Sequence, residues 1–359
     1  MHSLIKSLSS TALFVISLST LHAEAPQPLP SSRPKALHDW NLFAEGDWLY
    51  WKANETGLGY ALNQEGFDPN HIELMGFGDV VNPHFYWESG FRLGLGYNFP
   101  RDQWTLQLLW TWYEGKAGGS ITTTKEEGAI IYPSLLHPNF FNDQNIFSTN
   151  QAKSNLLIHL NVLDLDLCRE FKTGKHLSLK PRVGIRSAWI NQNYDISYQD
   201  LTYYDPTSKE ILPALNLYTT NMTNNFWGLG PFSGLDTNWN LGKGFSLFGD
   251  FSIALLYGSF DISQSENFVA TGGEGLILSE KNNFHAGRAV TDLQLGIRWQ
   301  SSFAKDRFRF LVQGGWDHHM FFSQNQMFHF VSGQNWGVFV QNQGDLYFQG
   351  WNLSTGFYY

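Results

Sequence analysis

The last nine residues alternate between apolar and polar side chains, which predicts a β-strand that closes the chain. One parity is mostly aromatic or aliphatic and the other is mostly small and polar: Trp351, Leu353, Thr355, Phe357 and Tyr359 against Asn352, Ser354, Gly356 and Tyr358. Successive side chains of a strand point to opposite faces, so one face is apolar. The pattern fits the final strand of a closed membrane barrel, and also the last strand of a soluble β-sandwich.

The same alternation recurs along the chain and predicts about ten strands. Their apolar parities carry aliphatic and aromatic residues throughout, as in Phe91–Tyr97, Trp104–Trp112, Leu177–Trp189, Phe245–Tyr257, Leu293–Trp299 and Phe308–Trp316. Phe248 and Leu256 fall on the opposite parity, so the interior is not expected to be uniformly polar. Tryptophan-rich outward faces suit a membrane better than water.

The connections between these strands alternate in length. Four are short, at 99–103, 172–175, 241–244 and 301–305, and five are long, at about 54–86, 117–154, 193–224, 259–287 and 321–344. This alternation is typical of outer-membrane barrels, with short turns on one side and surface loops on the other. We therefore predict an all-β fold, a transmembrane antiparallel up-and-down β-barrel, with up to about 16 strands if the long connections hide more.

Two local irregularities are expected in these strands. The apolar parity shifts between Leu156–Val162 and Leu163–Leu167, which predicts a β-bulge. Pro181 lies on the apolar parity and, having no backbone N–H, predicts a local break in pairing.

The N-terminal residues predict export. Residues 1–23 resemble a secretory signal peptide, residues 24–38 form a proline-rich periplasmic linker, and the barrel occupies residues 39–359. The composition agrees with a barrel, because only 15% of residues are charged and 16% are aromatic. The net charge of −9 argues against binding nucleic acid. Cys168 is the single cysteine; it excludes an internal disulfide and leaves either a small strand residue or an intermolecular disulfide.

Five segments carry a family resemblance: Trp48–Ala53, Gly90–Tyr97, Val162–Leu167, Pro181–Arg186 and Phe226–Pro231. Their order and spacing resemble the major outer membrane protein-like porins of Chlamydia-related and Legionella-like bacteria. The resemblance implies a surface-exposed barrel porin, abundant in the envelope. The chlamydial proteins are rich in cross-linked cysteines, whereas this chain has only Cys168.

The candidate functional residues are charged side chains on the inward parity. The predicted pore-lining set is Asp164, Asp166, Glu170, Lys180, Arg182, Arg186, Arg92, Asp250, Asp292 and Arg298. Acidic and basic clusters on neighbouring strands would either form an ion-selective constriction or act as cross-strand pairs that stabilise the sheet. About ten strands would leave a narrow or partly blocked pore.

We expect an outer-membrane porin that passes ions and small solutes, with a structural role in the envelope and a possible homo-oligomer. The alternative is a surface adhesin or coat barrel without an open pore, because aromatic and amide residues such as Tyr203-Tyr204 and Gln334-Asn335-Trp336 fill the long connections. A barrel hydrolase would need chemistry at Asp317-His318-His319, but adjacent strand residues face opposite sides. No enzyme activity, cofactor or metal site is expected.

Overall fold

The computed structural model describes residues 42–64, 78–99, 104–123, 129–138, 146–205, 207–208, 210–303, 308–331 and 338–359. The chain divides into Met1–Leu37 and His38–Tyr359, and the described residues all belong to the second unit. The predicted signal peptide and linker, turn residues 100–103 and 304–305, and Gln334-Asn335-Trp336 lie outside the described residues. Within the described part, no helix is long and apolar enough to cross a membrane.

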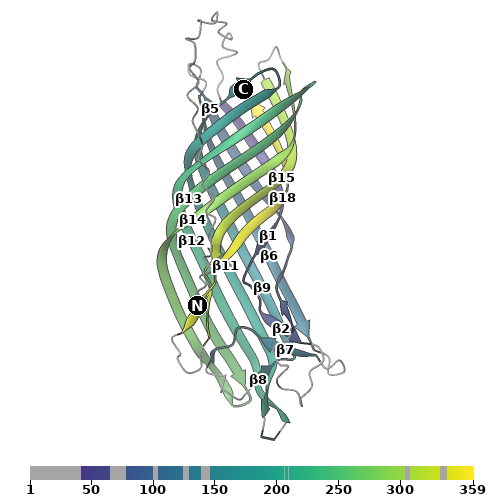
Figure 1. The fold of residues 1–359 in the computed structure, drawn as a ribbon, viewed down its shortest axis with the longest axis vertical. Coiled ribbons are helices and arrows are strands. Elements are labelled where there is room, and N and C mark those ends of the chain that lie inside the picture. The colour runs from purple at the N-terminus through teal and green to yellow at the C-terminus, as the bar shows by residue number, and fades with distance from the viewer. Residues whose placement is uncertain are drawn as a thin grey trace, which may run out of the picture. The chain divides into compact units, whose positions relative to one another are not determined.

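Ten antiparallel strands close into a barrel (Figure 1). They are β1 (Leu42–Glu55), β5 (Trp87–Asn98), β6 (Trp104–Thr122), β9 (Gln151–Arg169), β11 (Leu177–Asp205), β12 (Glu210–Gly242), β13 (Phe245–Ala270), β14 (Gly273–Phe303), β15 (Phe308–Asn325) and β18 (Gly344–Tyr358). Each pairs with the next in this order, and β18 pairs with β1 from Phe43↔Tyr358 to Glu55↔Leu346. The predicted all-β up-and-down barrel, including the role of the final strand in closing it, is confirmed.

Eight short strands lie in the connections, and none of them adds a further strand to the ring. They are β2 (Ala61–Gln64), β3 (Asp79–Val81), β4 (His84–Phe85), β7 (Ile130–Pro133), β8 (Ile146–Ser148), β10 (Phe171–Thr173), β16 (Phe328–Phe330) and β17 (Phe339–Gln341). The ring therefore stays at ten strands. We call the end with the four short connections the turn end and the opposite end the loop end.

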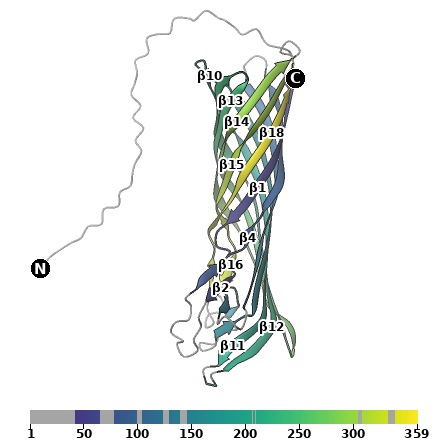
Figure 2. The ribbon, with the colours of Figure 1, turned by 90° about the vertical axis from the view of Figure 1, so that its right-hand side faces the viewer.

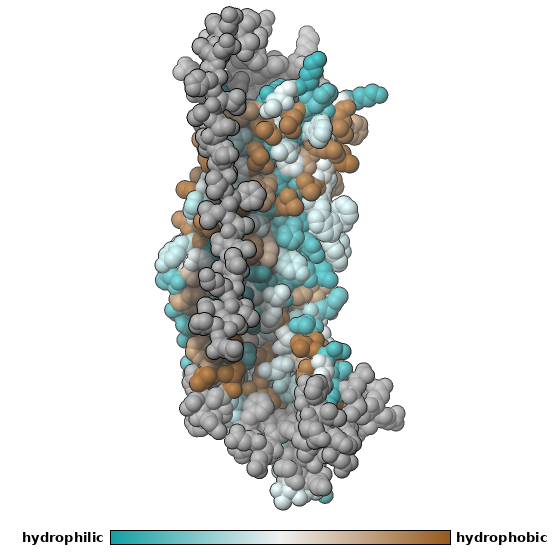
Figure 3. Space-filling model, in the orientation of Figure 1, coloured by the Kyte–Doolittle hydropathy of each residue, from teal (hydrophilic) through white to brown (hydrophobic). Residues whose placement is uncertain are grey.

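An apolar band surrounds the barrel, bounded by aromatic side chains at both ends. Along β13, Phe251, Ile253, Leu255 and Tyr257 point outward, and at least half of each side chain is exposed. In a membrane barrel, lipid covers such a face. Figure 3 shows such side chains as brown atoms on the outside of the strands. On β12 the band runs from Trp227 to Trp239; at ~3.4 Å per residue and a tilt of about 40°, this is roughly 30 Å, enough for the apolar core of a membrane.

Aromatic girdles mark the two limits of this band. The loop-end girdle contains Trp48, Tyr50, Trp87, Trp110, Trp112, Trp189, Trp227, Tyr257, Trp316 and Trp351. Its rings touch around the wall: Tyr50 stacks on Trp87 with centroids 5.4 Å apart, and Trp316 lies edge-on to Trp351 at 5.2 Å. The turn-end girdle contains Tyr97, Trp104, Trp239, Phe245, Trp299 and Phe357. Such girdles place the aromatic rings at the two membrane interfaces.

Beyond the loop-end girdle the polarity of each long strand inverts. On β11 the outward residues change from Val183 and Ile185 to Asn191, Asn193 and Asp195. The inward residues change in the opposite sense, from charged Lys180, Arg182 and Arg186 to buried Ile190, Tyr194, Ile196 and Tyr198. Outside the membrane the strands thus bury an apolar face and expose a polar one, as in a water-soluble protein.

This inversion corrects two sequence predictions. The connections predicted at 193–224 and 259–287 are mostly strand, because β11–β12 and β13–β14 continue to turns at 207–208 and 271–272. The predicted bulge near Val162 is wrong: β9 keeps one register against β6 and β11 throughout. Its apolar parity switches because Leu160 faces the interior and Leu163 faces the lipid. The break in pairing predicted at Pro181 is present on one side of β11. The ladder to β12 runs past Pro181 without a register shift, but on the other side pairing is interrupted at Lys180 and Pro181, between Leu179↔Phe171 of β10 and Arg182↔Cys168 of β9.

A cap of short segments fills the interior at the loop end, where β2 and β16 lie beside the extended β11 and β12 (Figure 2). It comprises residues 58–64, β3, β7, residues 135–137 and the β16–β17 hairpin. Tyr194 and Tyr198 donate hydrogen bonds from their hydroxyls to the carbonyls of Leu58 (2.6 Å) and Tyr60 (2.5 Å). Buried tyrosine side chains therefore tie the cap to the wall.

Candidate functional site: the ionic layer of the lumen

Charged side chains gather inside the barrel at the height of the apolar band. We call them the ionic layer: Asp47, Arg92, Asp164, Asp166, Lys180, Arg182, Arg186, Asp236, Asp250, Asp292, Asp317 and His319. They project from eight strands, because the inward parity of each strand carries a charge at similar height. A charged group at this depth is costly unless it is paired.

Arg186 is the centre of one group of ion pairs. Its guanidinium donates to both oxygens of Asp164 on the neighbouring β9, at 2.7 Å each, and to Asp292 on β14 at 2.6 Å. Ser252 on β13 also donates to Asp292, at 2.7 Å. Strands β12 and β13 separate β11 from β14 in the ring, so the Arg186–Asp292 pair spans the lumen rather than one rung of the sheet.

His319 continues this chain of contacts to the opposite wall. Its Nδ1 lies 2.8 Å from Asp292, and its Nε2 lies 3.3 Å from a guanidinium nitrogen of Arg92 on β5. Arg92 pairs with Asp47 at 3.2 Å and with Asp317 at 3.6 Å. Asn352 donates a hydrogen bond to Asp317. An unbroken series of polar contacts therefore joins β9 to β1 across the interior.

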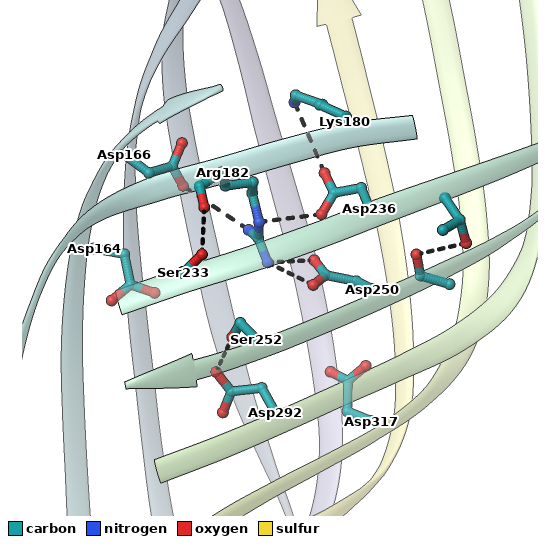
Figure 4. Close-up of polar contacts among 12 residues, drawn as sticks. Asp164, Asp166, Lys180, Arg182, Ser233, Asp236, Asp250, Ser252, Asp292 and Asp317 are labelled. Carbon is teal, nitrogen blue, oxygen red and sulfur yellow. Dashed lines mark hydrogen bonds and ion pairs between the residues drawn. The ribbon is translucent and has the colours of Figure 1, made fainter. Parts of the chain in front are cut away.

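Arg182 organises a second group nearer the turn end (Figure 4). It donates to both oxygens of Asp250 at 2.5 and 2.6 Å and lies 3.1 Å from Asp236 and 3.9 Å from Asp166. Lys180 lies 4.0 Å from Asp236. Three carboxylates thus surround one guanidinium, and across the whole layer aspartates outnumber lysine and arginine.

Nine of the ten predicted pore-lining residues lie on the inner face: Asp164, Asp166, Lys180, Arg182, Arg186, Arg92, Asp250, Asp292 and Arg298. Arg298 stands apart from the ionic layer; it donates to Gln313 at 2.8 Å and its guanidinium lies 5.0 Å from the Phe248 ring centroid. Glu170 is a correction: it lies between β9 and β10 with an exposed side chain, because β9 ends at Arg169.

The arrangement differs from acidic and basic walls facing each other across a pore. Arg186 pairs with Asp164 as its direct cross-strand neighbour, which is the sheet-stabilising role that the sequence left open. The contacts that span the lumen add a second role, because they fill the cross-section. Arg186 is 8% exposed and Asp164 and Asp292 are each 11% exposed, so the layer leaves little space for free water.

Several members of the layer were missed or misjudged from sequence. Asp47 and Asp236 lie on the inward parity of their strands, and that parity was the signal that could have identified them. Asp317 and His319 face the lumen, whereas His318 faces outward and stacks on Tyr347 with centroids 5.8 Å apart. Among the described residues, no group of three or more His, Cys, Asp or Glu side chains could hold a metal ion. Cys168 is buried, and its thiol lies 3.5 Å from the carbonyl of Thr105.

Between the ionic layer and the loop end, the interior becomes apolar with a few buried polar groups. Phe226, Phe260 and Phe348 are fully or almost fully buried there. Glu55, at the end of β1 beyond the loop-end girdle, accepts two 2.8 Å hydrogen bonds from the Gln192 amide. Burial raises the pKa of the Glu55 carboxyl to about 8, so this group is mostly protonated at neutral pH.

Comparison with known proteins gave one family match. A family model described as the Legionella pneumophila major outer membrane protein precursor matches residues 32–358. No curated protein matches the chain.

Several solved barrels resemble the chain weakly. The outer membrane protease OmpT from Escherichia coli is 11% identical, with 89% of this chain and 96% of that chain covered and a TM-score of 0.39. A major outer membrane protein from Thermus thermophilus is 11% identical, with 88% and 99% covered and a TM-score of 0.30. A Pseudomonas aeruginosa FadL homologue is 9% identical, with 89% and 90% covered and a TM-score of 0.26. Likenesses of this strength say nothing about activity.

Proposed function

The chain belongs to the family of the Legionella pneumophila major outer membrane protein, and from this premise we propose that it is a narrow porin for ions and small solutes that also strengthens the envelope. It lies in the bacterial outer membrane. The observation that carries the proposal is the ionic layer at the height of the apolar band. Ionisable side chains at membrane depth are expensive and mark ion pathways more often than inert packing.

The geometry limits what such a porin would pass. The pairs centred on Arg186 and Arg92 cross the lumen, and the cap and aromatic core cover its loop end. A barrel of this size is largely filled by its own side chains, whereas about 16 strands leave a wide aqueous channel. We therefore expect low conductance, brief openings and exclusion of solutes larger than simple ions. The excess of aspartates favours cations over anions.

Planar-bilayer recording of the purified full-length protein tests this function. We expect discrete conductance steps well below those of a general diffusion porin, with a preference for potassium over chloride. Asp236→Asn with Asp250→Asn should lower that preference, because both carboxylates surround Arg182 in the layer. Lys153→Gln on β9 is the control, since its exposed side chain lies on the outward parity of the strand, away from the lumen.

A structural surface barrel without a pore is the second candidate. The observation in its favour is the apolar core beyond the girdle, where Phe226, Phe260 and Phe348 occupy the interior. Absence of any steps, together with loss of envelope integrity on deletion of the gene, would favour this candidate over the porin. Neither candidate function includes hydrolase activity, because both ring nitrogens of His319 already contact charged side chains: Arg92, Asp292 and Asp317.

A further inference from the structure

Outside the membrane the described strands no longer form a closed ring. Strand β15 pairs with β14 only from Phe303↔Phe308 to Val290↔Phe321. Strand β14 nevertheless continues to Gly273, paired with β13 as far as Ala270↔Gly273. Among the described residues, no strand pairs with the other edge of β14 between Gly273 and Ala289.

A free edge of this length is a template for strand addition. Backbone N–H and C=O groups of alternate residues point away from β13 and are ready to pair with another extended chain. The stretch from Leu278 to Ala289 is regular, because the only register shift of the β13–β14 pair lies at Glu266/Asn267, nearer the tip. No proline, which would remove a backbone N–H donor, lies in this stretch. The extended β13 and β14 reach past the end of the ring in Figure 1.

The side chains along this edge define the chemistry of a partner. Lys281 and His285 point outward and are exposed, and Arg288 points inward and is half-buried. Glu280 is the single acidic residue between Leu278 and Ala289, so the two cations outnumber it along the edge. The guanidinium of Arg288 lies 4.5 Å from the Phe260 ring centroid and donates to the carbonyl of Gly287 at 2.9 Å. Among the described residues no carboxylate pairs with it, in contrast to Arg92, Arg182 and Arg186.

The inward side chains add an apolar requirement. Phe284 stacks on Phe260 with ring centroids 5.2 Å apart, and Phe284 and Ala286 are only partly buried against the core. A strand added beside β14 would cover both of them. It would therefore place small apolar residues inward and acidic residues outward, opposite Lys281, with one further acid near Arg288.

We propose that the Leu278–Ala289 edge of β14 binds an extended, acidic segment of a partner protein outside the cell, which adds as an antiparallel strand. A second copy of this chain fits poorly. Copies in one membrane have the same orientation, so their β14 strands both run toward the membrane and their edges cannot align antiparallel. The lumen is not involved, so this binding is independent of conductance.

Two synthetic peptides and a pair of proline variants test the proposal on the full-length protein in detergent. One eight-residue peptide alternates Asp with Val and the other alternates Lys with Val; binding is followed by fluorescence anisotropy. We expect the Asp peptide to bind at least about tenfold more tightly, since it alone offers charge complementarity. The charge-reversed variant Lys281→Glu with Arg288→Glu should invert this preference.

Asn282→Pro and Asn283→Pro separate edge pairing from simple adhesion. Neighbouring strand residues direct their N–H groups to opposite sides, so one substitution removes a donor from the free edge and the other removes one from the β13 ladder. The variant that keeps the wild-type thermal stability is the edge variant, and it should bind the Asp peptide at least about tenfold more weakly. Equal binding of the two peptides, or unchanged binding by the edge variant, overturns the proposal. A monomer–dimer shift caused by charge reversal would assign the edge to a second copy and overturn it as well.

Discussion

Replacing Arg186 with methionine is the substitution that should most disturb the interior. The arginine donates two hydrogen bonds to Asp164 and one to Asp292, all between 2.6 and 2.7 Å, and is 8% exposed. Methionine retains much of the volume and removes the charge. Two carboxylates, each 11% exposed, would then lose their main counter-charge, although Ser252 and His319 still contact Asp292.

The size of the effect follows from breaking a buried ion pair on one side only. Such a change costs about 3–5 kcal/mol, because the remaining charge stays buried without compensation. We expect a loss of folding free energy in this range for Arg186→Met. Adding Asp164→Asn and Asp292→Asn should restore more than half of the loss, since neutral amides no longer require the guanidinium. The triple variant should also show larger conductance steps, because the Arg186–Asp292 pair across the lumen is then absent.

Urea unfolding in lipid vesicles, followed by tryptophan fluorescence and by gel mobility of unheated samples, measures these free energies. Lys172→Met on the exposed strand β10 is the matched control and should change stability by less than about 0.5 kcal/mol. A loss below about 1 kcal/mol for Arg186→Met would refute the reasoning. The pair would then behave as a solvated surface contact, which contributes little.

Three further predictions test other parts of the structure. Leu255→Arg, on the lipid face of β13, should cost about 2–4 kcal/mol of folding free energy, whereas Ser263→Arg on the same outward face beyond the girdle should cost less than about 1 kcal/mol. Equal losses would show that the apolar band does not end at the loop-end girdle. Gly258→Ala should lower the free energy of unfolding by about 1–3 kcal/mol, because the added Cβ would lie 2.0 Å from the carbonyl oxygen of Trp227. Gly287→Ala should leave it unchanged, because no atom lies closer than 3.9 Å to the added Cβ. Urea unfolding in vesicles compares the two variants. Burial raises the pKa of Glu55 to about 8 from an ordinary 4.5, so unfolding between these pH values releases its proton. The free energy of unfolding should therefore fall by about 1.4 kcal/mol for each unit that the pH rises in this range. Glu55→Gln should remove this pH dependence, and an unchanged dependence would assign it to another group.

The sequence was sufficient to predict the closed ring. Phe245 to Tyr257 and Leu293 to Trp299 alternate with the period of a strand, and lipid contact leaves no need for covering elements that would blur this pattern. The pairing of the final strand with the first follows from closure alone. Strand order was predictable because each strand pairs with its neighbour along the chain.

The ends of the strands were not predictable by the same rule. Strands β11 to β14 continue past the girdle, but the side that carries apolar residues changes there. A search for one constant apolar parity therefore ends each strand at Trp189, Trp227 or Tyr257. The same change produced the false bulge in β9, where Leu160 and Leu163 belong to two different environments.

The candidate site was predictable as a parity but not as a network. Asp164, Arg182 and Arg186 could be placed on the inner face from alternation. Which charges meet depends on the curvature and stagger of the ring, which bring β11 within reach of β14 and β15 within reach of β5. Local sequence contains no information on those distances.

The polarity inversion on each long strand also fixes its vertical position. A strand moved by two residues along its axis would expose Asn191 or Asn225 to hydrocarbon at one level and withdraw Val183 or Leu235 from it at another. Every hairpin therefore encodes its own depth, independently of its neighbours. Assembly could proceed one hairpin at a time, with each finding its level before the ring is sealed between β18 and β1.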